Sequence, residues 1–334
     1  MAVKTTFEKL DFETILSEYD LGEYLQSKPL TAGAVQTNFL LITTVGKFVL
    51  RYYENRSKES VLFESDLIEF LKSKNYPCPA QFKNRHAEFV GIYKNKPYAI
   101  FEFVDGEHLE NPDKEQKQQL IEKVAVLQNL TMNYVPTHRE YRWNYSIELC
   151  EELVQKEVDK INTKNAKEKL IWFKNELQEI VLLKSLPKGI CHCDFHFSNV
   201  LFKDGNFRAL IDFDDANYTY LTFDLASLID PFVSSFRWDT WSKFKKDENV
   251  FNFDEAKKIV QEYEKYRPLS NDEREYLYDV YKLSLMLDCI WRFERGNAND
   301  FYERRKLDYL NGLGRKNFYE KIFGTMNDNC MPIE

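Results

Sequence analysis

The sequence predicts an α+β protein in which strands come first and helices follow. Residues 30–104 are rich in β-branched and aromatic residues, interrupted by clusters of turn residues, which is typical of antiparallel hairpins. Beyond residue 107, apolar residues recur at helical spacing in one segment after another. A length of 334 residues suits one large domain or two lobes. We therefore divide the chain into an N-terminal domain, residues 1–104, and a helical C-terminal domain, residues 105–334.

The bulk composition is that of an ordinary globular protein. Hydrophobic residues make up 43% and charged residues 30% of the chain, which argues against disorder. The formal net charge of −8 disfavours a nucleic-acid partner, because proteins that bind phosphate backbones are usually basic. No apolar run approaches the roughly 18 residues that span a bilayer, and the charged N-terminus lacks the apolar core of a signal peptide. We expect a cytoplasmic protein with no membrane partner.

The N-terminal domain begins with a predicted helix over residues 7–26, which Pro29 ends. A β-hairpin is expected over residues 30–53, with its turn at 44–47, followed by a helix over residues 57–74. A second hairpin follows, and after it a series of helices. These later elements are predicted at residues 88–104 for the hairpin and at 113–131, 146–184, 222–230, 254–266, 271–295 and 298–321 for the helices.

Two charged residues in the N-terminal domain fall on faces that are otherwise apolar. Arg51 shares a strand face with Val49 and Tyr53, and a buried cation needs an anionic partner. Glu64 lies in the apolar stripe of the next helix, so we predict that it pairs with Arg51. An ion pair that only stabilises the sheet is the simpler alternative.

The most informative stretch is residues 190–213. His192 opens a loop that carries Asp194 and Asn199, five residues apart, and a predicted hairpin of strands 200–202 and 207–211 then leads to Asp212. The hairpin returns Asp212 to the neighbourhood of Asn199. Two carboxylates and an amide facing one point suit phosphoryl transfer, which needs a proton acceptor and oxygen ligands for Mg²⁺. The alternative is a plain hairpin whose polar residues cap its turns.

The six cysteines are scattered except for Cys191 and Cys193, which flank His192. A zinc site is conceivable there. However, in an extended segment the two thiols face away from His192, and no second Cys or His pair stands at metal spacing. Buried thiols are therefore the better interpretation.

The pattern His-x-Asp-x-x-x-x-Asn, a hairpin, and then Ile-Asp-Phe resembles the catalytic segment of the aminoglycoside phosphotransferase and choline kinase superfamily. The resemblance implies a two-lobed protein-kinase-like fold, with a small antiparallel sheet in the N-lobe and a larger helical C-lobe. It also implies that Asp194 is the catalytic base, that Asn199 and Asp212 hold Mg²⁺, and that His192 and Asp224 support the loop. For Asp224, attraction to a helix N-terminus is an explanation that can hold as well.

The same resemblance assigns a nucleotide site to the N-terminal lobe, with ATP as the cofactor. Arg51, held by Glu64, would touch the α- and β-phosphates, where the family usually has Lys. Gly33 stands where a phosphate-covering loop would lie, although an ordinary hairpin is about as good an explanation. The main chain between Glu102 and Val104 resembles the interlobe linker that meets adenine.

Within the superfamily, residues 17–25, 37–41 and 77–79 resemble the N-terminal part of the type II homoserine kinases. The expected acceptor of the γ-phosphate is thus the hydroxyl group of homoserine. Choline or ethanolamine, a sugar or an aminoglycoside are the alternatives, and a silent kinase-like binding module is a further one. The sequence leaves open whether the protein is a monomer or a homodimer.

Four residues are candidates for binding such a substrate. Asp214 and Asp215 follow the metal carboxylate and could meet a substrate ammonium, or they could be solvated turn residues. Arg292 and Arg295 are the candidates for a substrate carboxylate.

Overall fold

The computed structural model describes residues 5–30, 35–195, 197–230, 251–294 and 301–325. Two compact units emerge from the contacts within the chain. The first combines Met1–Leu109 with Val135–Arg142 and Ser198–Asp215, and the second contains the remaining segments. Since the first unit draws on two later segments of the chain, the predicted division at residue 104 stays a prediction.

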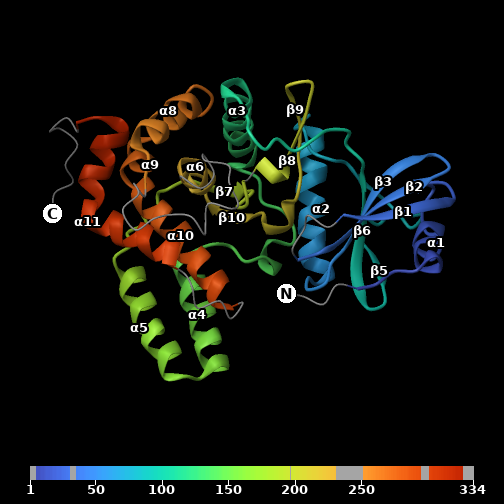
Figure 1. Cartoon of the computed structure of the whole chain (residues 1–334), viewed down its shortest axis with the longest axis horizontal. Coiled ribbons are helices and arrows are strands. Elements are labelled where there is room, and N and C mark those ends of the chain that lie inside the picture. The colour runs from blue at the N-terminus through green and yellow to red at the C-terminus, as the bar shows by residue number, and fades with distance from the viewer. Residues whose placement is uncertain (1–4, 31–34, 196, 231–250, 295–300, 326–334) are drawn as a thin grey trace. The chain divides into compact units, whose positions relative to one another are not determined.

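The first unit is built around an antiparallel sheet (Figure 1). Its strand order is β1-β2-β3-β6-β4, and β5 pairs with β6 away from this path. Both predicted hairpins are present within the sheet, one formed by β2 and β3 and the other by β5 and β6. The strands span Tyr24–Leu30 (β1), Thr37–Thr43 (β2), Gly46–Tyr52 (β3), Gln81–Phe82 (β4), Gly91–Tyr93 (β5) and Lys96–Glu102 (β6).

The first helix is shorter than predicted. Helix α1 spans Lys9–Ser17, and the chain then turns through Gly22, whose φ of 77° favours glycine. Residues 24–26, which we predicted to be helical, begin strand β1 instead, and Tyr24 pairs with Thr43 of β2. The prediction was wrong because the apolar spacing fits a helix, whereas a partner strand later in the chain decides the outcome.

The two faces of the sheet carry different residues. Alternate residues of β3 and β6, such as Leu50 and Ile100, form a core with Ile15 and Leu16 of α1. Successive side chains of a strand point to opposite faces, so Arg51 lies on the other side of β3. Helix α2, Lys58–Ser73, contributes buried residues there, including Glu64, and its N-cap is Ser57, the first residue of the predicted helix over residues 57–74.

The predicted hairpin of the catalytic segment is also part of the first unit. Strands β8, Val200–Lys203, and β9, Asn206–Leu210, pair antiparallel. The two residues between them, Asp204 and Gly205, have φ of 50° and 77°. Positive φ at both central positions is the mark of a tight two-residue hairpin turn, and Asp-Gly is a favoured sequence for it.

The second unit is mainly helical. Strands β7, Lys188–Cys191, and β10, Asn217–Tyr220, form a small antiparallel ribbon. The helices agree with the predicted segments, except that residues 271–295 divide into two and that Gly314, with φ of 76°, interrupts the last one. They are α3 (Lys114–Thr131), α4 (Ile147–Ile161), α5 (Lys164–Gln178), α6 (Phe223–Ile229), α8 (Phe253–Glu264), α9 (Asn271–Glu275), α10 (Leu277–Glu294) and α11 (Phe301–Phe323).

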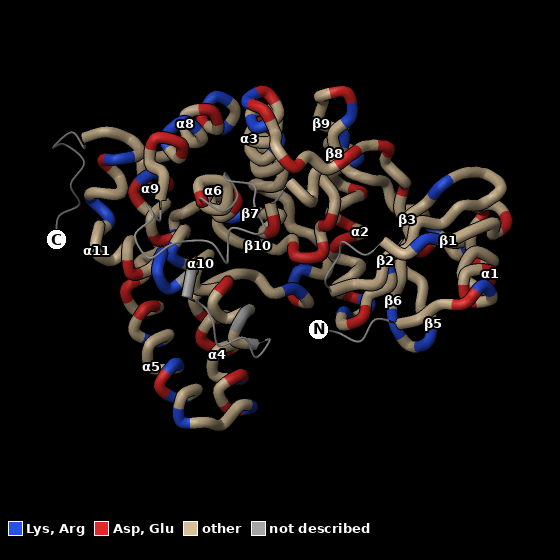
Figure 2. The backbone as a smooth tube through the Cα atoms, in the orientation of Figure 1, with Lys and Arg blue, Asp and Glu red and all other residues tan. Residues whose placement is uncertain are grey.

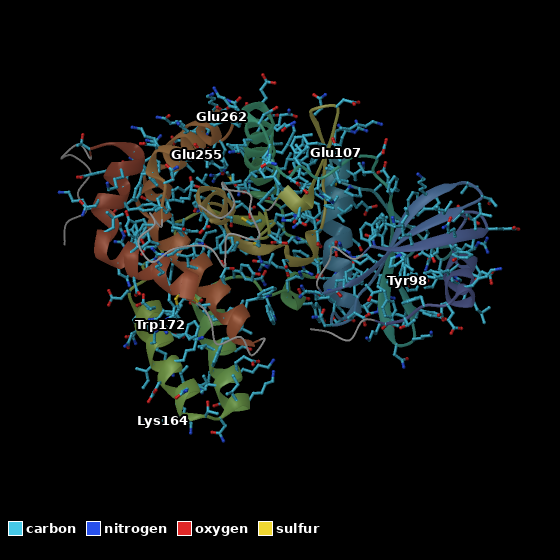
Figure 3. The ribbon with its side chains drawn as sticks, in the orientation of Figure 1. Tyr98, Glu107, Lys164, Trp172, Glu255 and Glu262 are labelled. Carbon is cyan, nitrogen blue, oxygen red and sulfur yellow. The ribbon has the colours of Figure 1, made fainter. Side chains whose placement is uncertain are left out.

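Helices α4 and α5 form a helical hairpin, as predicted for residues 146–184 (Figure 1). Acidic and basic residues both lie along these two helices (Figure 2). Lys164 lies at the end of the hairpin where α5 begins, and it pairs with Glu168 one turn later at 3.6 Å (Figure 3).

Within the described part of the chain, the helices are all too short or too polar to cross a membrane. The cytoplasmic location and the choice between monomer and homodimer stay predictions.

Candidate active site

The loop that carries Asp194 in the second unit follows strand β7, and one buried carboxylate binds its backbone. Asp224, in the first turn of α6, accepts hydrogen bonds from the backbone N–H groups of His192 and Cys193, both at 2.9 Å. Burial raises the pKa of Asp224 to about 6, although these N–H groups act in the opposite direction. Asp224 therefore anchors the two residues that precede Asp194 in the chain, and its supporting role in catalysis stays a prediction.

The His192 ring is buried beneath the same loop. Its Nδ1 accepts a hydrogen bond from the backbone N–H of Asp194 at 3.3 Å, and the ring packs against Phe195. An accepting Nδ1 carries no proton, so the neutral ring has its proton on Nε2. The Asp194 side chain itself is exposed. The loop thus combines a fixed backbone with an accessible carboxylate, as a catalytic base requires.

In the first unit, the β8–β9 hairpin brings the predicted metal ligands close along the main chain. Val200 pairs with Leu210, and the N–H of Ile211 donates to the carbonyl of Asn199 at 2.8 Å. The next residue, Asp212, has a φ of 67°, a left-handed conformation that Asp tolerates better than most residues. The predicted return of Asp212 to the neighbourhood of Asn199 is confirmed for the backbone.

Arg51 stands between two carboxylates of the first unit. Its Nη1 lies 2.8 Å from Oδ1 of Asp212 and 3.5 Å from Oε1 of Glu64, and its Nε donates to Asn38 at 3.2 Å. Burial would lower the pKa of Arg51, but the charges of Asp212 and Glu64 outweigh it and raise this pKa. The predicted pairing of Arg51 with Glu64 is confirmed.

Glu64 is the more buried partner of this pair, with 1% of its surface exposed. It also accepts a hydrogen bond from the hydroxyl of Tyr53 at 2.8 Å. Burial raises the pKa of Glu64 to about 7 against the opposing charge of Arg51, which lies closer to Asp212. Arg51 thus links the face of α2 to the predicted metal carboxylate.

The two acidic residues after Asp212 are already paired with arginines of the same unit. Arg56 donates to Asp214 from Nε at 2.9 Å and lies 2.9 Å from Asp215. Gln36 donates to the other oxygen of Asp214 at 2.8 Å. Burial would raise the pKa of Asp214, but the charges of Arg56 and Arg142 lower it to about 2. These contacts argue against a substrate ammonium at Asp214, since its charge is already balanced.

Arg142 fixes the backbone of the same segment. Its guanidinium donates to the carbonyl groups of Phe213 and Asp214 and to both the carbonyl and the hydroxyl of Ser60 in α2. It also stacks over the Phe63 ring, 4.8 Å from the centroid. Through these contacts, α2 and the segment after Asp212 are held together.

The remaining predicted residues are less engaged or lie outside the described residues. The N–H of Glu102 donates to the carbonyl of Ala80 at 2.8 Å, so this N–H is not available to a nucleotide. Val104 follows the end of β6. Gly33 and Arg295 lie outside the described residues, and Arg292 belongs to α10 but its side chain is not described.

The comparisons with known proteins identify the chain's family. The model of the phosphotransferase enzyme family matches residues 26–269. The chain belongs to this family. The homoserine kinase of Caulobacter sp. (strain K31) is 30% identical over 320 residues, which cover 92% of this chain and 89% of that protein. The homoserine kinase of Rhodospirillum rubrum is 29% identical over 313 residues, or 93% and 89% of the two chains.

Solved structures with the same fold are small-molecule kinases. One is an amicoumacin kinase in complex with AMP-PNP, Ca²⁺ and Ami, with a TM-score of 0.64 at 17% identity, covering 97% of this chain and 96% of that one. Another is a microcompartment-associated aminopropanol kinase, with a TM-score of 0.61 at 15% identity, covering 91% and 95%. The predicted kinase-like fold, the superfamily and the phosphotransferase class are confirmed.

The residues at the predicted metal position of this phosphotransferase fit Mg²⁺. Asn199 offers an amide oxygen and Asp212 a carboxylate, and Mg²⁺ takes oxygen ligands, often only one or two from the protein. Across the described residues, His, Cys, Asp and Glu do not gather in threes around any point that could hold a metal. That is compatible with a metal that takes most of its ligands from phosphates and water.

Sequence reasoning missed several residues of this region, namely Gln36, Arg56 and Arg142. Arg56 lies 158 residues from Asp214 in the chain, and Arg142 lies 72 residues from it. A local signal existed in the run Asp212, Asp214 and Asp215, because carboxylates this close repel one another unless cations lie nearby.

Proposed function

We propose that the protein is a homoserine kinase that transfers the γ-phosphate of ATP to the side-chain hydroxyl of homoserine. The observation that carries the proposal is the similarity to curated homoserine kinases over more than nine-tenths of the chain. The exposed Asp194 on its anchored loop, with Asn199 and Asp212 after it, supports the proposed chemistry.

In the proposed reaction, Asp194 orients the substrate hydroxyl and accepts its proton. The hydroxyl oxygen forms a bond to the γ-phosphorus while the bond from that phosphorus to the bridging oxygen of ADP breaks. The products are a phosphate ester, ADP and one proton. Asn199 and Asp212 would hold Mg²⁺, which would balance the charge of the phosphates.

Arg51 is our candidate for contact with the nucleotide phosphates. Its charge is held in place by Glu64 and Asp212, and its planar fork suits phosphate oxygens. The main chain near Glu102 and Val104 remains the candidate for adenine, through the Glu102 carbonyl and the Val104 backbone. For the substrate carboxylate, Arg292 and Arg295 remain candidates.

An acceptor panel tests the proposal. Purified protein with Mg-ATP is offered homoserine, serine, choline, ethanolamine, simple sugars and kanamycin, and ADP release is measured. We expect homoserine to have the highest kcat/KM. Serine, which is one methylene shorter, is the matched control for reach, and we expect it to be at least about tenfold poorer. Preference for choline or kanamycin would refute homoserine as the substrate and leave the kinase assignment standing. No ADP release with any acceptor, in protein that binds Mg-ATP, would refute the kinase assignment.

A further inference from the structure

A row of buried polar side chains in the second unit leads away from the catalytic loop. Gln128 of α3 donates from Nε2 to Oδ2 of Asp224 at 3.3 Å, and its Oε1 accepts from the hydroxyl of Tyr263 in α8. The Tyr263 oxygen accepts from Nη1 of Arg267 at 3.1 Å, and Nη2 of Arg267 donates to Glu273. All five residues are at most 4% exposed.

The chemistry of the members fixes the direction of every hydrogen bond in the row. Arg267 can only donate, so the Tyr263 oxygen must accept from it and give its own proton to Gln128. The Gln128 amide must then turn its Nε2 towards Asp224. Oδ2 of Asp224 accepts hydrogen bonds from Nε2 of Gln128 and from the backbone N–H of His192. Oδ1 accepts one from the backbone N–H of Cys193. The row thus sets the orientation of the carboxylate that holds the loop.

Helices α3 and α8 are also held together by contacts outside this row of side chains. At the surface, Gln118 of α3 donates to Glu262 of α8 at 3.1 Å, and Lys117 lies 4.0 Å from Glu255 (Figure 3). Buried apolar residues of both helices, such as Val124 and Val260, complete the packing. Moreover, a buried ion pair such as that of Arg267 with Glu273 is often no more stabilising than apolar residues of the same volume.

We propose that Gln128, Tyr263 and Arg267 are positioning residues that act through Asp224 on the loop carrying Asp194. The proposal rests on the proposed function for its kinetic consequence. Removing the Tyr263 hydroxyl leaves Oε1 of Gln128 without this donor and Nη1 of Arg267 without this acceptor. The amide can then rotate, and the orientation of Asp224 is no longer set. A displacement of the loop by about 1 Å is expected to cost about 10- to 100-fold in kcat.

Tyr263→Phe is the test, and Tyr281→Phe is its matched control. Tyr281 lies in α10 of the same unit, is 1% exposed, and donates to Asp230 at 2.7 Å, which Lys306 also holds at 2.7 Å. Each variant loses one buried hydroxyl: that of Tyr263 donates to Gln128 and accepts from Arg267, and that of Tyr281 donates to Asp230, so Tm should fall in both and at least as far in Tyr263→Phe. The Tyr263 hydroxyl is joined through Gln128 and Asp224 to the loop that carries Asp194.

Two measurements are made on both variants and the wild type. Hydrogen exchange followed by mass spectrometry reports on the peptide that covers residues 188–195, whose backbone N–H groups bind Asp224. Steady-state kinetics give kcat and the KM for ATP. For Tyr263→Phe we expect exchange in this peptide to be about tenfold faster, kcat to be at least about tenfold lower and KM to stay within about twofold. For Tyr281→Phe we expect all three to match the wild type.

The outcomes separate the proposal from its alternatives. If Tyr263→Phe loses Tm like the control but keeps the exchange and kcat of the wild type, the row is only a structural feature and the proposal is overturned. Faster exchange with unchanged kcat also overturns it. If the wild type turns over no acceptor, the proposed function fails, and exchange alone still decides whether the row positions the loop. Should Tyr263→Phe not fold, Arg267→Lys makes the same test, because Lys lacks the planar fork whose two nitrogens donate to Tyr263 and Glu273.

Discussion

Replacing Asp224 by Asn should separate catalysis from stability. The carboxylate accepts two backbone N–H groups at 2.9 Å, and an Asn side chain offers one oxygen and one amide group, so one of these hydrogen bonds is lost. A hydrogen bond to a charged group contributes about 1.5–3 kcal/mol. Burial nevertheless raises the pKa of Asp224 from 3.8 to about 6 with both hydrogen bonds in place, so the folded protein disfavours the carboxylate by about 3 kcal/mol relative to a neutral side chain. Because this figure already includes the hydrogen bonds, the neutral Asn should not lower the free energy of unfolding at pH 7.5.

The same shift gives the pH dependence its sign. Because the pKa of Asp224 is higher in the folded protein, its contribution to stability is fully present below about pH 3.8 and is lost as the pH rises through about 6. Asn does not titrate. Compared with the wild type, Asp224→Asn should therefore gain about 2 kcal/mol of relative stability between about pH 4.5 and about pH 7.5, and be the more stable protein at the higher pH.

Turnover should respond quite differently. With one N–H group of the loop unpaired, Asp194 loses its fixed position, and we expect kcat to fall about 100-fold at pH 7.5, where the stability of the variant does not fall. In the wild type, protonation of Asp224 turns an O–H group towards one of its donors, so kcat should also fall below about pH 6. Urea unfolding at the two pH values and a kcat–pH profile make the test. A variant that keeps kcat within about twofold of the wild type at pH 7.5 would refute the reasoning.

Three further substitutions test the roles assigned to single residues. Asp194→Asn should lower kcat to less than about a tenth of wild type while calorimetry shows unchanged Mg-ATP affinity, because the amide cannot accept the hydroxyl proton. Asp212→Ala should abolish the Mg²⁺ dependence of nucleotide binding, and an unaltered Mg-ATP affinity would remove Asp212 from the metal site. Arg51→Ala should weaken nucleotide binding about tenfold without unfolding the protein, because Glu64, whose pKa is about 7, can take up a proton when its partner is lost. A collapse of Tm with normal affinity in the folded fraction would make Arg51 a structural residue instead.

The sequence predicts those parts of the site that depend on neighbours in the chain. The turn at Asp204 and Gly205 fixes the β8–β9 hairpin, so the position of Asp212 relative to Asn199 follows from a few residues. Likewise, Arg51 and Glu64 each stand on a face that periodicity identifies, and the two faces belong to consecutive elements. Pattern and geometry agree here because few alternative arrangements exist.

Where a hydrogen-bond partner lies far along the chain, the sequence indicates that a buried polar group needs a partner but does not identify it. Gln128 occupies the buried face of α3, one turn after Val124 and just before Thr131, so the helical pattern already indicates that its amide is buried. A buried amide requires a hydrogen-bond partner. Nothing in the spacing of α3 indicates that Tyr263, 135 residues later, supplies it. The same limit explains why β1 was predicted to be helical at residues 24–26.

In the acidic turn after β9, arginines from distant parts of the chain balance the charges of neighbouring carboxylates. Asp212, Asp214 and Asp215 crowd into four residues, and their mutual repulsion would expand the turn. Arg51 meets the first of them, and Arg56 meets the other two. The pKa of Asp214, lowered to about 2, shows that the arginines more than offset both burial and repulsion. Asp214 therefore holds its charge without a ligand. Burial and the neighbouring charge of Asp214 instead raise the pKa of Asp215, although Arg56 lies 2.9 Å from its carboxylate. A substrate ammonium is not needed to balance Asp214, and we expect its binding site elsewhere.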